Sequence, residues 1–242
     1  STGEGVDDLW AAIGDHRAAL EASGKAGHPA LLKYHDFRLK KSWFKVNRGE
    51  MLMEYVDGVS LDKIEKPPVP EIILVFLQVA AGLSHLQRRG ALHGDLRPGR
   101  ILVSKNGQVK VAGYGLSLLP DNKGAPLGSR LYAPPERIKE GAFDEKTEVY
   151  AFGATLYHVL TGRSPNSGQR SLGEAGKIPL PSALNPTIPK PLDNLIVTCL
   201  QSQPSKRPEG LFELSEQMQK VVKALSLDPG SLGRPSFVGK TS

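Results

Sequence analysis

The chain has 242 residues, of which 39% are hydrophobic, which is enough for one large domain or two small lobes around a packed core. Its 31 Lys and Arg against 25 Asp and Glu give a net charge of +6, which permits attraction to phosphate-rich partners but is not polybasic. No run approaches the roughly 20 apolar residues that cross a bilayer, so we expect no transmembrane segment. The single cysteine, Cys199, excludes an internal disulfide and favours a cytoplasmic location.

The first third of the sequence predicts one helix and one β-hairpin. Apolar residues recur at helical spacing over 7–23, and Asp7 and Asp8 suit the positive end of a helix dipole. The stretch 34–56 has two β-like runs around Asn47-Arg48-Gly49, which predicts a hairpin with its turn there and a loop at Asp57-Gly58.

The remaining chain is predominantly helical by pattern. The segment 71–90 is apolar around most of its circumference, which predicts a buried helix. Short β-like runs at 101–103 and 109–111 flank a turn at 105–107, and further helices are expected over 145–162, 192–201 and 209–225. The sequence thus predicts an α+β protein with a reduced β-containing lobe at 1–56, a larger helical lobe at 57–225 and a flexible tail at 226–242.

Six short motifs follow one another along the chain. The run 93–102, HGDLRPGRIL, resembles the catalytic loop of protein kinases, and Gly113-Tyr114-Gly115 stands at the place of the family's DFG. The others are a hinge-like strand at 51–56 (MLMEYV), an APE-like segment at 132–136 (YAPPE), a helix start at 148–153 (EVYAFG) and a late KRP at 206–208. Over residues 29–218 the chain is therefore similar to the bilobal protein-kinase-like fold.

The resemblance assigns scaffold and hinge roles to several residues. It implies a buried ion pair between Glu136 and Arg207, and it implies that Glu148 supports the catalytic loop. It also implies an internal packing role for His93 and Tyr114. The hinge would comprise Met53, at the gatekeeper position, with Glu54 and Val56.

The same resemblance exposes replacements at the positions that carry phosphoryl transfer. Asp95 keeps the place of the catalytic base, but Arg100 replaces the Asn that holds one metal ion, and Gly113 replaces the Asp that holds the other. Divalent magnesium needs oxygen ligands, so its conventional binding is expected to fail. We expect Arg100 to pair with Asp95; contact of Arg100 with an anionic ligand is the less favoured alternative.

Other parts of the kinase machinery are also altered. Gly94 replaces the Arg that reads a phosphate on the activation segment, where only Ser117, Ser129 and Tyr132 could be modified. Arg97 stands within the altered loop. The family's first strands and strand Lys do not fit before residue 7, and Gly3-Glu4-Gly5 is a weak phosphate-loop candidate. Residue 19, at the family's helix Glu position, is Ala, with Glu21 the nearest acid.

These features predict a catalytically impaired pseudokinase that acts in signalling as a protein-interaction scaffold or allosteric regulator. Its partner would be a protein, such as an active kinase or a complex subunit, with no metal and no cofactor; ATP binding without magnesium is disfavoured. The alternative is a weak or unconventional ATP-dependent Ser/Thr phosphotransferase or a nucleotide-binding switch. A third hypothesis, contact of the basic hairpin 37–48 with nucleic acid or an anionic membrane, is less favoured than a solvated hairpin.

Overall fold

The computed structural model describes residues 27–42, 45–114, 130–141, 143–166, 178–231 and 235–238; over 37–42 and 45–51 the description is of the backbone. Several sequence predictions lie outside these residues. They are the helix at 7–23, the Gly3-Glu4-Gly5 loop, the helix positions Ala19 and Glu21, and the motif and modification positions Gly115, Ser117 and Ser129.

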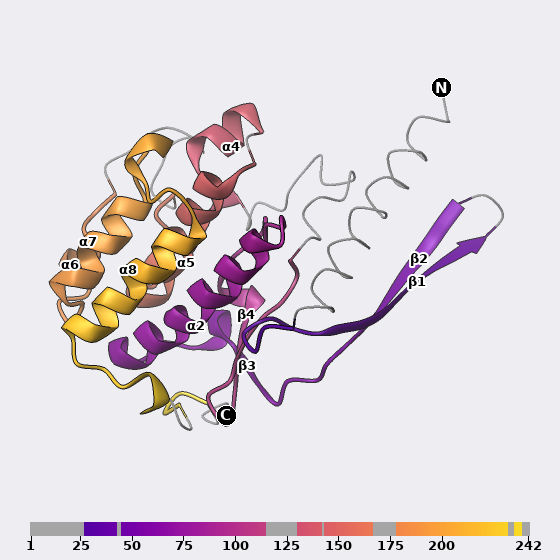
Figure 1. Ribbon diagram of the computed structural model, residues 1–242, viewed down its shortest axis with the longest axis horizontal. Coiled ribbons are helices and arrows are strands. Elements are labelled where there is room, and N and C mark those ends of the chain that lie inside the picture. The colour runs from indigo at the N-terminus through magenta and orange to yellow at the C-terminus, as the bar shows by residue number, and fades with distance from the viewer. Residues whose placement is uncertain are drawn as a thin grey trace.

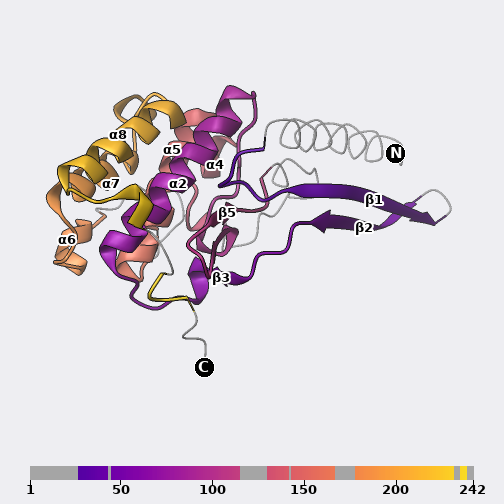
Figure 2. The ribbon, with the colours of Figure 1, turned by 60° about the horizontal axis from the view of Figure 1, so that its bottom comes forward.

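An antiparallel hairpin joins β1 (Tyr34–Ser42) to β2 (Lys45–Met53) and extends from the helical body as an arm (Figure 1; Figure 2). The hairpin was predicted, but its turn was misplaced. Leu39 pairs with Gly49 and Lys40 with Arg48, so the expected turn residues lie within β2. A register shift between Lys40 and Lys41 absorbs the irregularity, which allows the strands to continue past the Asn-Arg-Gly segment.

A second, three-stranded antiparallel sheet lies at the edge of the helical body, with strand order β3 (Gly58–Ser60), β4 (Ile101–Ser104) and β5 (Val109–Val111). The β4–β5 pair is the small hairpin that the sequence predicted. The expected loop at Asp57-Gly58 instead leads directly into β3. A side chain at Gly58 would place its Cβ 2.1 Å from the Val103 carbonyl oxygen, so glycine permits this close strand pairing.

The helices are α2 (Val69–Arg88), α4 (Pro135–Glu140), α5 (Glu145–Thr161), α6 (Pro181–Leu184), α7 (Lys190–Cys199) and α8 (Leu211–Ala224). Short 3-10 turns occupy Leu61–Lys63, Pro98–Arg100, Pro204–Lys206 and Pro229–Ser231. Asp144 and Thr147 form a reciprocal capping box at the start of α5, and Gly162 ends that helix with a left-handed φ of 72°. The four long helices α2, α5, α7 and α8 confirm the predicted helical segments.

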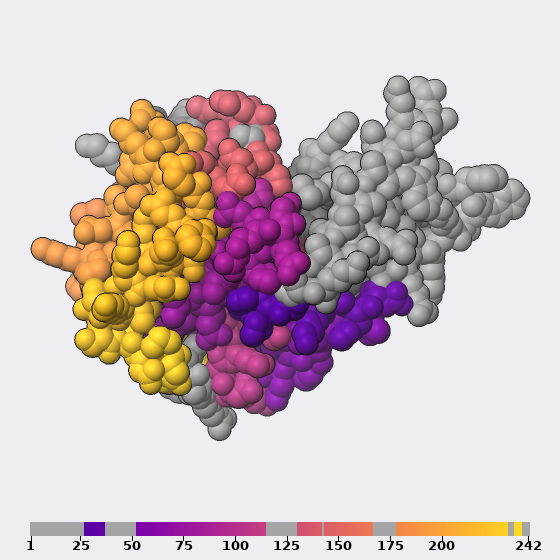
Figure 3. Space-filling model, in the orientation of Figure 1, coloured from indigo at the N-terminus to yellow at the C-terminus, as the bar shows by residue number. Residues whose placement is uncertain are grey.

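Helix α2 is the centre of the core, which explains its apolar circumference. Its Phe76 ring meets the Phe152 ring of α5 edge to face at 5.3 Å, and both side chains are buried. Within the described residues, α2 alone is long and apolar enough to cross a membrane, but 67% of that stretch is buried inside the protein. In Figure 3 its purple surface lies between the yellow and orange surface of the C-terminal helices and the indigo surface of the first described residues. Helix α2 is thus a core helix.

The C-terminal segment contributes to the same body. Phe237 and Val238 are buried, and the Ser236 backbone N–H donates to the Glu71 carboxylate at 3.0 Å. Within the segment that was expected to be a flexible tail, residues 236–238 therefore contact the helical body. The domain limits given above stay a prediction.

We predict that Gly153→Ala lowers the free energy of unfolding. A Cβ at residue 153 would lie 2.5 Å from the Cys199 Cβ, where α5 and α7 touch, and Cys199 is completely buried. Alanine favours an isolated helix by about 1 kcal/mol over glycine, but overpacking a buried contact costs about 1–3 kcal/mol. Chemical denaturation should therefore show a net loss of up to about 2 kcal/mol.

The matched control for this contact is the pair Gly153→Ala with Cys199→Gly, compared with Cys199→Gly alone. In the Cys199→Gly background the clashing Cβ is gone, so Gly153→Ala should become neutral or stabilising. An equal loss in both backgrounds would show that α5 and α7 do not meet at this point.

Candidate functional site

The backbone of the catalytic-loop segment is held by a carboxylate from α5. Glu148, 1% exposed, accepts hydrogen bonds from the backbone N–H of His93 at 2.9 Å and of Gly94 at 2.7 Å. Burial raises the pKa of Glu148, and the two backbone donors oppose that shift by stabilising the charged form. The sequence predicted support of the loop by Glu148, and the structure supplies the contacts.

His93 connects the loop to the segment that precedes Gly113. Its Nδ1 accepts the backbone N–H of Asp95 at 3.1 Å, so the ring proton lies on Nε2 and is donated to the Ala112 carbonyl oxygen at 3.0 Å. Burial lowers the pKa of His93 to about 4. A neutral His93 thereby fixes the relative positions of Asp95 and Gly113.

One carboxylate oxygen of Asp95 accepts hydrogen bonds from two arginines. Its Oδ2 accepts from Arg100 Nε at 3.1 Å, from Arg100 Nη2 at 3.0 Å and from Arg97 Nε at 3.3 Å. The side chains of Asp95, Arg97 and Arg100 are 14%, 35% and 29% exposed, so the cluster reaches the surface. The expected Arg100–Asp95 pair is present, and Arg97 joins it, which the sequence analysis had not anticipated.

Gly113 has a left-handed φ of 82°, and the Arg100 guanidinium lies against it. A Cβ built at residue 113 would be 2.9 Å from both Cζ and Nη1 of Arg100. Arg100 therefore fills the space into which a side chain at residue 113 would begin. The backbone conformation and this contact both require glycine.

Tyr34, at the start of β1, was missed by sequence reasoning. Its hydroxyl accepts the Gly113 N–H at 2.6 Å, and its ring meets the Tyr114 ring edge to face at 5.0 Å. The Tyr114 hydroxyl donates to the Leu32 carbonyl oxygen at 2.6 Å. Burial raises the pKa of Tyr34, so the phenol stays protonated at neutral pH. No local sequence signal marks this contact, because it joins residues 79 positions apart.

Two positions considered for phospho-regulation have structural explanations. Gly94 adopts a left-handed φ of 81°, which favours glycine over the arginine of the family pattern. Tyr132 is 7% exposed and hydrogen-bonds His158 Nδ1 at 2.6 Å, while burial raises its pKa to about 12. Tyr132 is therefore a packing residue rather than an accessible modification site.

The expected ion pair between Glu136 and Arg207 is bidentate. Arg207 Nη1 donates to Glu136 Oε1 at 2.6 Å, and Nη2 donates to Oε2 at 3.1 Å. The Arg207 side chain is 0% exposed and also donates to the carbonyls of Gln201, Lys146 and Ser202, so its burial is compensated. This pair joins α4 to the turn before α8.

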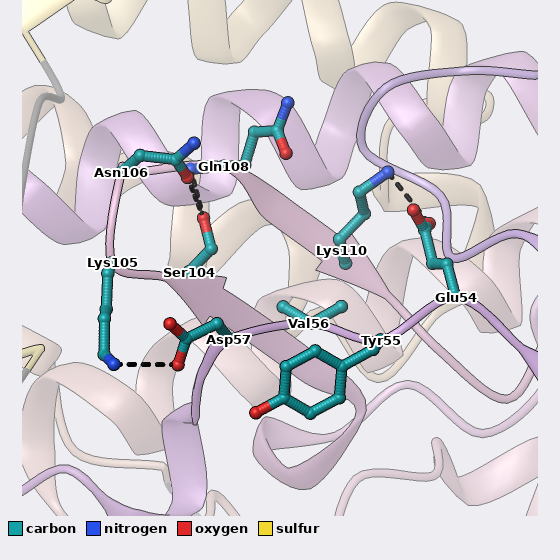
Figure 4. A pocket seen from close by; sticks show the side chains of 9 residues that line it. All are labelled: Glu54, Tyr55, Val56, Asp57, Ser104, Lys105, Asn106, Gln108 and Lys110. Atoms are coloured by element: carbon teal, nitrogen blue, oxygen red, sulfur yellow. Dashed lines mark hydrogen bonds and ion pairs between the residues drawn. The ribbon is translucent and has the colours of Figure 1, made fainter.

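The hinge-like segment lines a hollow of about 490 Å³ beside the β4–β5 hairpin (Figure 4). Glu54 and Val56 contribute to its wall, and Glu54 pairs with the largely buried Lys110 of β5 at 2.9 Å. Asp57 pairs with Lys105 across the hollow, also at 2.9 Å. Met53, the expected gatekeeper, is 45% exposed and is not among the lining residues. Asp95 and Arg100 also lie outside this hollow.

The residues at the two metal positions of the kinase family do not fit a divalent cation. Arg100 and Gly113 have no side-chain oxygen, and Asp95 is bound to two guanidinium groups. Within the described part of the chain, no group of three or more His, Cys, Asp or Glu side chains could hold a metal. The site instead places an arginine where the family pattern has a metal ligand.

The chain matches the protein kinase domain family over residues 17–222 and therefore belongs to that family. A search of solved structures found the Mycobacterium tuberculosis PknI kinase domain, with a TM-score of 0.64 and 23% identity. That likeness covers 86% of this chain and 78% of the PknI chain. It shows the kinase-like α+β bilobal fold that the sequence predicted.

Curated relatives are named serine/threonine-protein kinases. PknL of Mycobacterium tuberculosis is 29% identical over 191 residues, which is 73% of this chain and 48% of PknL. The kinase pkn2 of Myxococcus xanthus is 30% identical over 87% of this chain and 27% of its own length. PrkC of Bacillus subtilis is 25% identical over 91% of this chain and 35% of its own length. The chain thus spans about half the length of PknL and less of the other two.

These comparisons overturn three predictions. The non-enzymatic pseudokinase scaffold is contradicted by kinase-named relatives along most of the chain, which favour the alternative of a phosphotransferase. The classification as a pseudokinase is wrong for the same reason. The expectation of no cofactor is also contradicted, because the family uses ATP with a divalent cation. The prediction treated two missing oxygen ligands as evidence of a missing reaction, whereas the similarity to kinases extends over most of the chain.

We predict that stability depends on His93 below neutral pH. Because burial lowers the pKa of His93 from 6.5 to about 4, the folded state binds fewer protons than the unfolded state between these pH values. The contribution of neutral His93 to the free energy of unfolding is therefore complete above pH 6.5 and is lost as pH falls toward 4. The loss is on the order of 3 kcal/mol. Denaturation at several pH values should show a shallower slope over this window for His93→Gln than for the native chain.

The control for this pH dependence is His35→Gln, which removes an exposed histidine outside the site. It should keep the native slope. If His93→Gln and the native chain lose stability in parallel between pH 6.5 and 4, His93 is not the buried neutral group described here.

Proposed function

We propose that this chain is the phosphotransferase domain of a serine/threonine-protein kinase, with an unconventional phosphate site. The observation that carries the proposal is Asp95, a partly exposed carboxylate on a loop whose backbone is fixed by buried Glu148. Membership of the protein kinase domain family supports it. A rigid loop that presents a carboxylate at the surface suits the positioning that phosphoryl transfer requires.

In the proposed reaction Asp95 aligns the acceptor. The hydroxyl oxygen of a Ser or Thr attacks the γ-phosphorus of ATP, the bond from that phosphorus to the β–γ bridging oxygen breaks, and ADP leaves. The hydroxyl proton passes to an Asp95 carboxylate oxygen. Two arginines compete for that carboxylate, so we expect transfer to be slow compared with a loop whose carboxylate has no such partners.

The cofactor proposed is ATP, with the hinge residues Met53, Glu54 and Val56 nearest its base. In the family a divalent cation, when bound, offsets phosphate charge during transfer. Since the residues at 100 and 113 do not fit that ion, this chain's own contribution is the fixed positive charge of Arg100 beside Asp95. An arginine also forms directional hydrogen bonds to phosphate oxygens.

The acceptor and partners are inferred at the level of chemical class. We infer that the acceptor is a protein hydroxyl and that the domain acts in signalling, in contact with a protein partner such as a second kinase or a complex subunit. We place it on the cytoplasmic side of the cell, where ATP is available. Cys199 agrees with a reducing location, because it is a free thiol that burial keeps from reacting. Contact of 37–48 with nucleic acid or lipid stays a prediction.

We predict measurable transfer of phosphate from ATP to a protein acceptor, and its loss in Asp95→Asn. General-base contributions of this kind are worth about 100-fold to 10,000-fold, so the variant should retain at most about 1% of the rate. The measurement uses radiolabelled ATP, with magnesium or manganese, and the purified chain with a mixed Ser/Thr-rich protein acceptor. Phosphoamino-acid analysis should show only phosphoserine and phosphothreonine.

The matched control is Asp228→Asn, which neutralises an exposed aspartate after α8, outside both the catalytic loop and the hollow beside the hinge. It should keep the native rate. Transfer that is equal in the native chain and in Asp95→Asn would come from a contaminant. That outcome, or no transfer with either metal, would refute the proposal.

A further inference from the structure

We infer that Arg100 is a resident cation that binds a phosphate oxygen of the nucleotide, so that the chain binds ATP without an added divalent ion. The inference rests on the proposed use of ATP and specifies the chemistry of its phosphate site. It concerns binding alone, and it can therefore hold or fail separately from phosphoryl transfer.

The first support is steric. The Arg100 guanidinium lies within 2.9 Å of the point where a Cβ of residue 113 would be, so it occupies the space of the side chain that Gly113 lacks. The φ of 82° at Gly113 keeps that space open, because residues other than glycine rarely adopt it. An arginine at 100 and a glycine at 113 are thus mutually dependent.

The second support is the orientation of the guanidinium. Arg100 uses Nε and Nη2 to hold Asp95 Oδ2, which fixes the plane of the group. Nη1 lies on the Gly113 side, and the side chain is 29% exposed. Guanidinium has five N–H donors, so donors remain beyond the two directed at Asp95. A phosphate oxygen can therefore be bound without breaking the Asp95 pair.

The third support is charge. The Asp95 carboxylate lies between the guanidinium groups of Arg97 and Arg100, and the Asp62 carboxylate lies close to Arg97, so the positive charge at this partly exposed position is that of the Arg100 guanidinium itself and not a net excess of the cluster. Charge-assisted bonds from arginine to phosphate are among the strong hydrogen bonds of proteins. A guanidinium at this position favours a phosphate oxygen and disfavours a second cation, so ATP free of magnesium is the ligand that Arg100 suits.

The test is calorimetric titration of ATP into the purified chain, once in excess EDTA and once with magnesium. We expect the dissociation constant in EDTA to be equal to that with magnesium within about threefold. Arg100→Ala should weaken binding in EDTA by at least about tenfold. Arg100→Lys keeps the charge but loses the planar guanidinium, so its affinity should lie between those of the native chain and Arg100→Ala. Arg89→Ala, which removes an exposed arginine after α2, should bind as the native chain does.

Two results would overturn the inference: ATP binding that appears only with magnesium, and equal binding by Arg100→Ala and the native chain in EDTA. If Arg100→Ala does not fold, which unliganded thermal unfolding would show, Arg100→Gln provides the second measurement. It keeps most of the side-chain length and a polar end but removes the positive charge, so binding in EDTA should again weaken by at least about tenfold; native-like binding by that variant would equally refute the inference.

The outcome also separates this inference from the proposed function. Binding in EDTA without phosphoryl transfer would support the resident cation and refute the phosphotransferase. If both phosphoryl transfer and ATP binding require magnesium, the phosphotransferase is supported and the resident cation is refuted.

Discussion

The buried carboxylate of Glu148 is the interaction on which the site depends. It lies on α5, a helix fixed in the core through the contact of Phe152 with Phe76 of α2. From there it accepts the backbone N–H groups of His93 and Gly94, so the position of the catalytic loop is set by the packing of the core. A buried charge is tolerated only when hydrogen bonds replace its water. The loop and the helix are therefore each required for the other's arrangement.

Beside that fixed loop, the chain has a guanidinium group and a glycine at the two positions where the kinase family has oxygen ligands for metal. Arg100 and Gly113 together remove both side-chain oxygens with which the kinase family holds metal, and the same pair brings a positive charge against Asp95. In the proposed site, a covalent part of the protein would supply positive charge to the triphosphate. Tyr34 stabilises this arrangement from β1, because its hydroxyl holds the Gly113 N–H and its ring packs on Tyr114.

The functional conclusion changed because the similarity to kinases extends along most of the chain, whereas the prediction of a pseudokinase rested on a few single positions. The sequence places side chains without a carboxylate or amide oxygen at the two positions where the kinase pattern has metal ligands, but a replaced ligand specifies which contact is lost and not which contact takes its place. Extended similarity to proteins named serine/threonine-protein kinases favours an enzyme. The proposed binding of phosphate by Arg100 would reconcile the altered positions with membership of the family.

The sequence by itself determined the long helices and the β4–β5 hairpin, because these follow from periodicity. The kinase-like fold and the altered positions 94, 100 and 113 followed from the resemblance of motifs that are continuous in the chain. It misplaced the turn of the β1–β2 hairpin, since register depends on pairing along both strands. Only the tertiary structure decided that Arg97 shares Asp95, that Tyr34 holds Gly113 and that Arg100 fills the space beside it. Those contacts join side chains whose meeting depends on how the elements pack, and no local pattern records that packing.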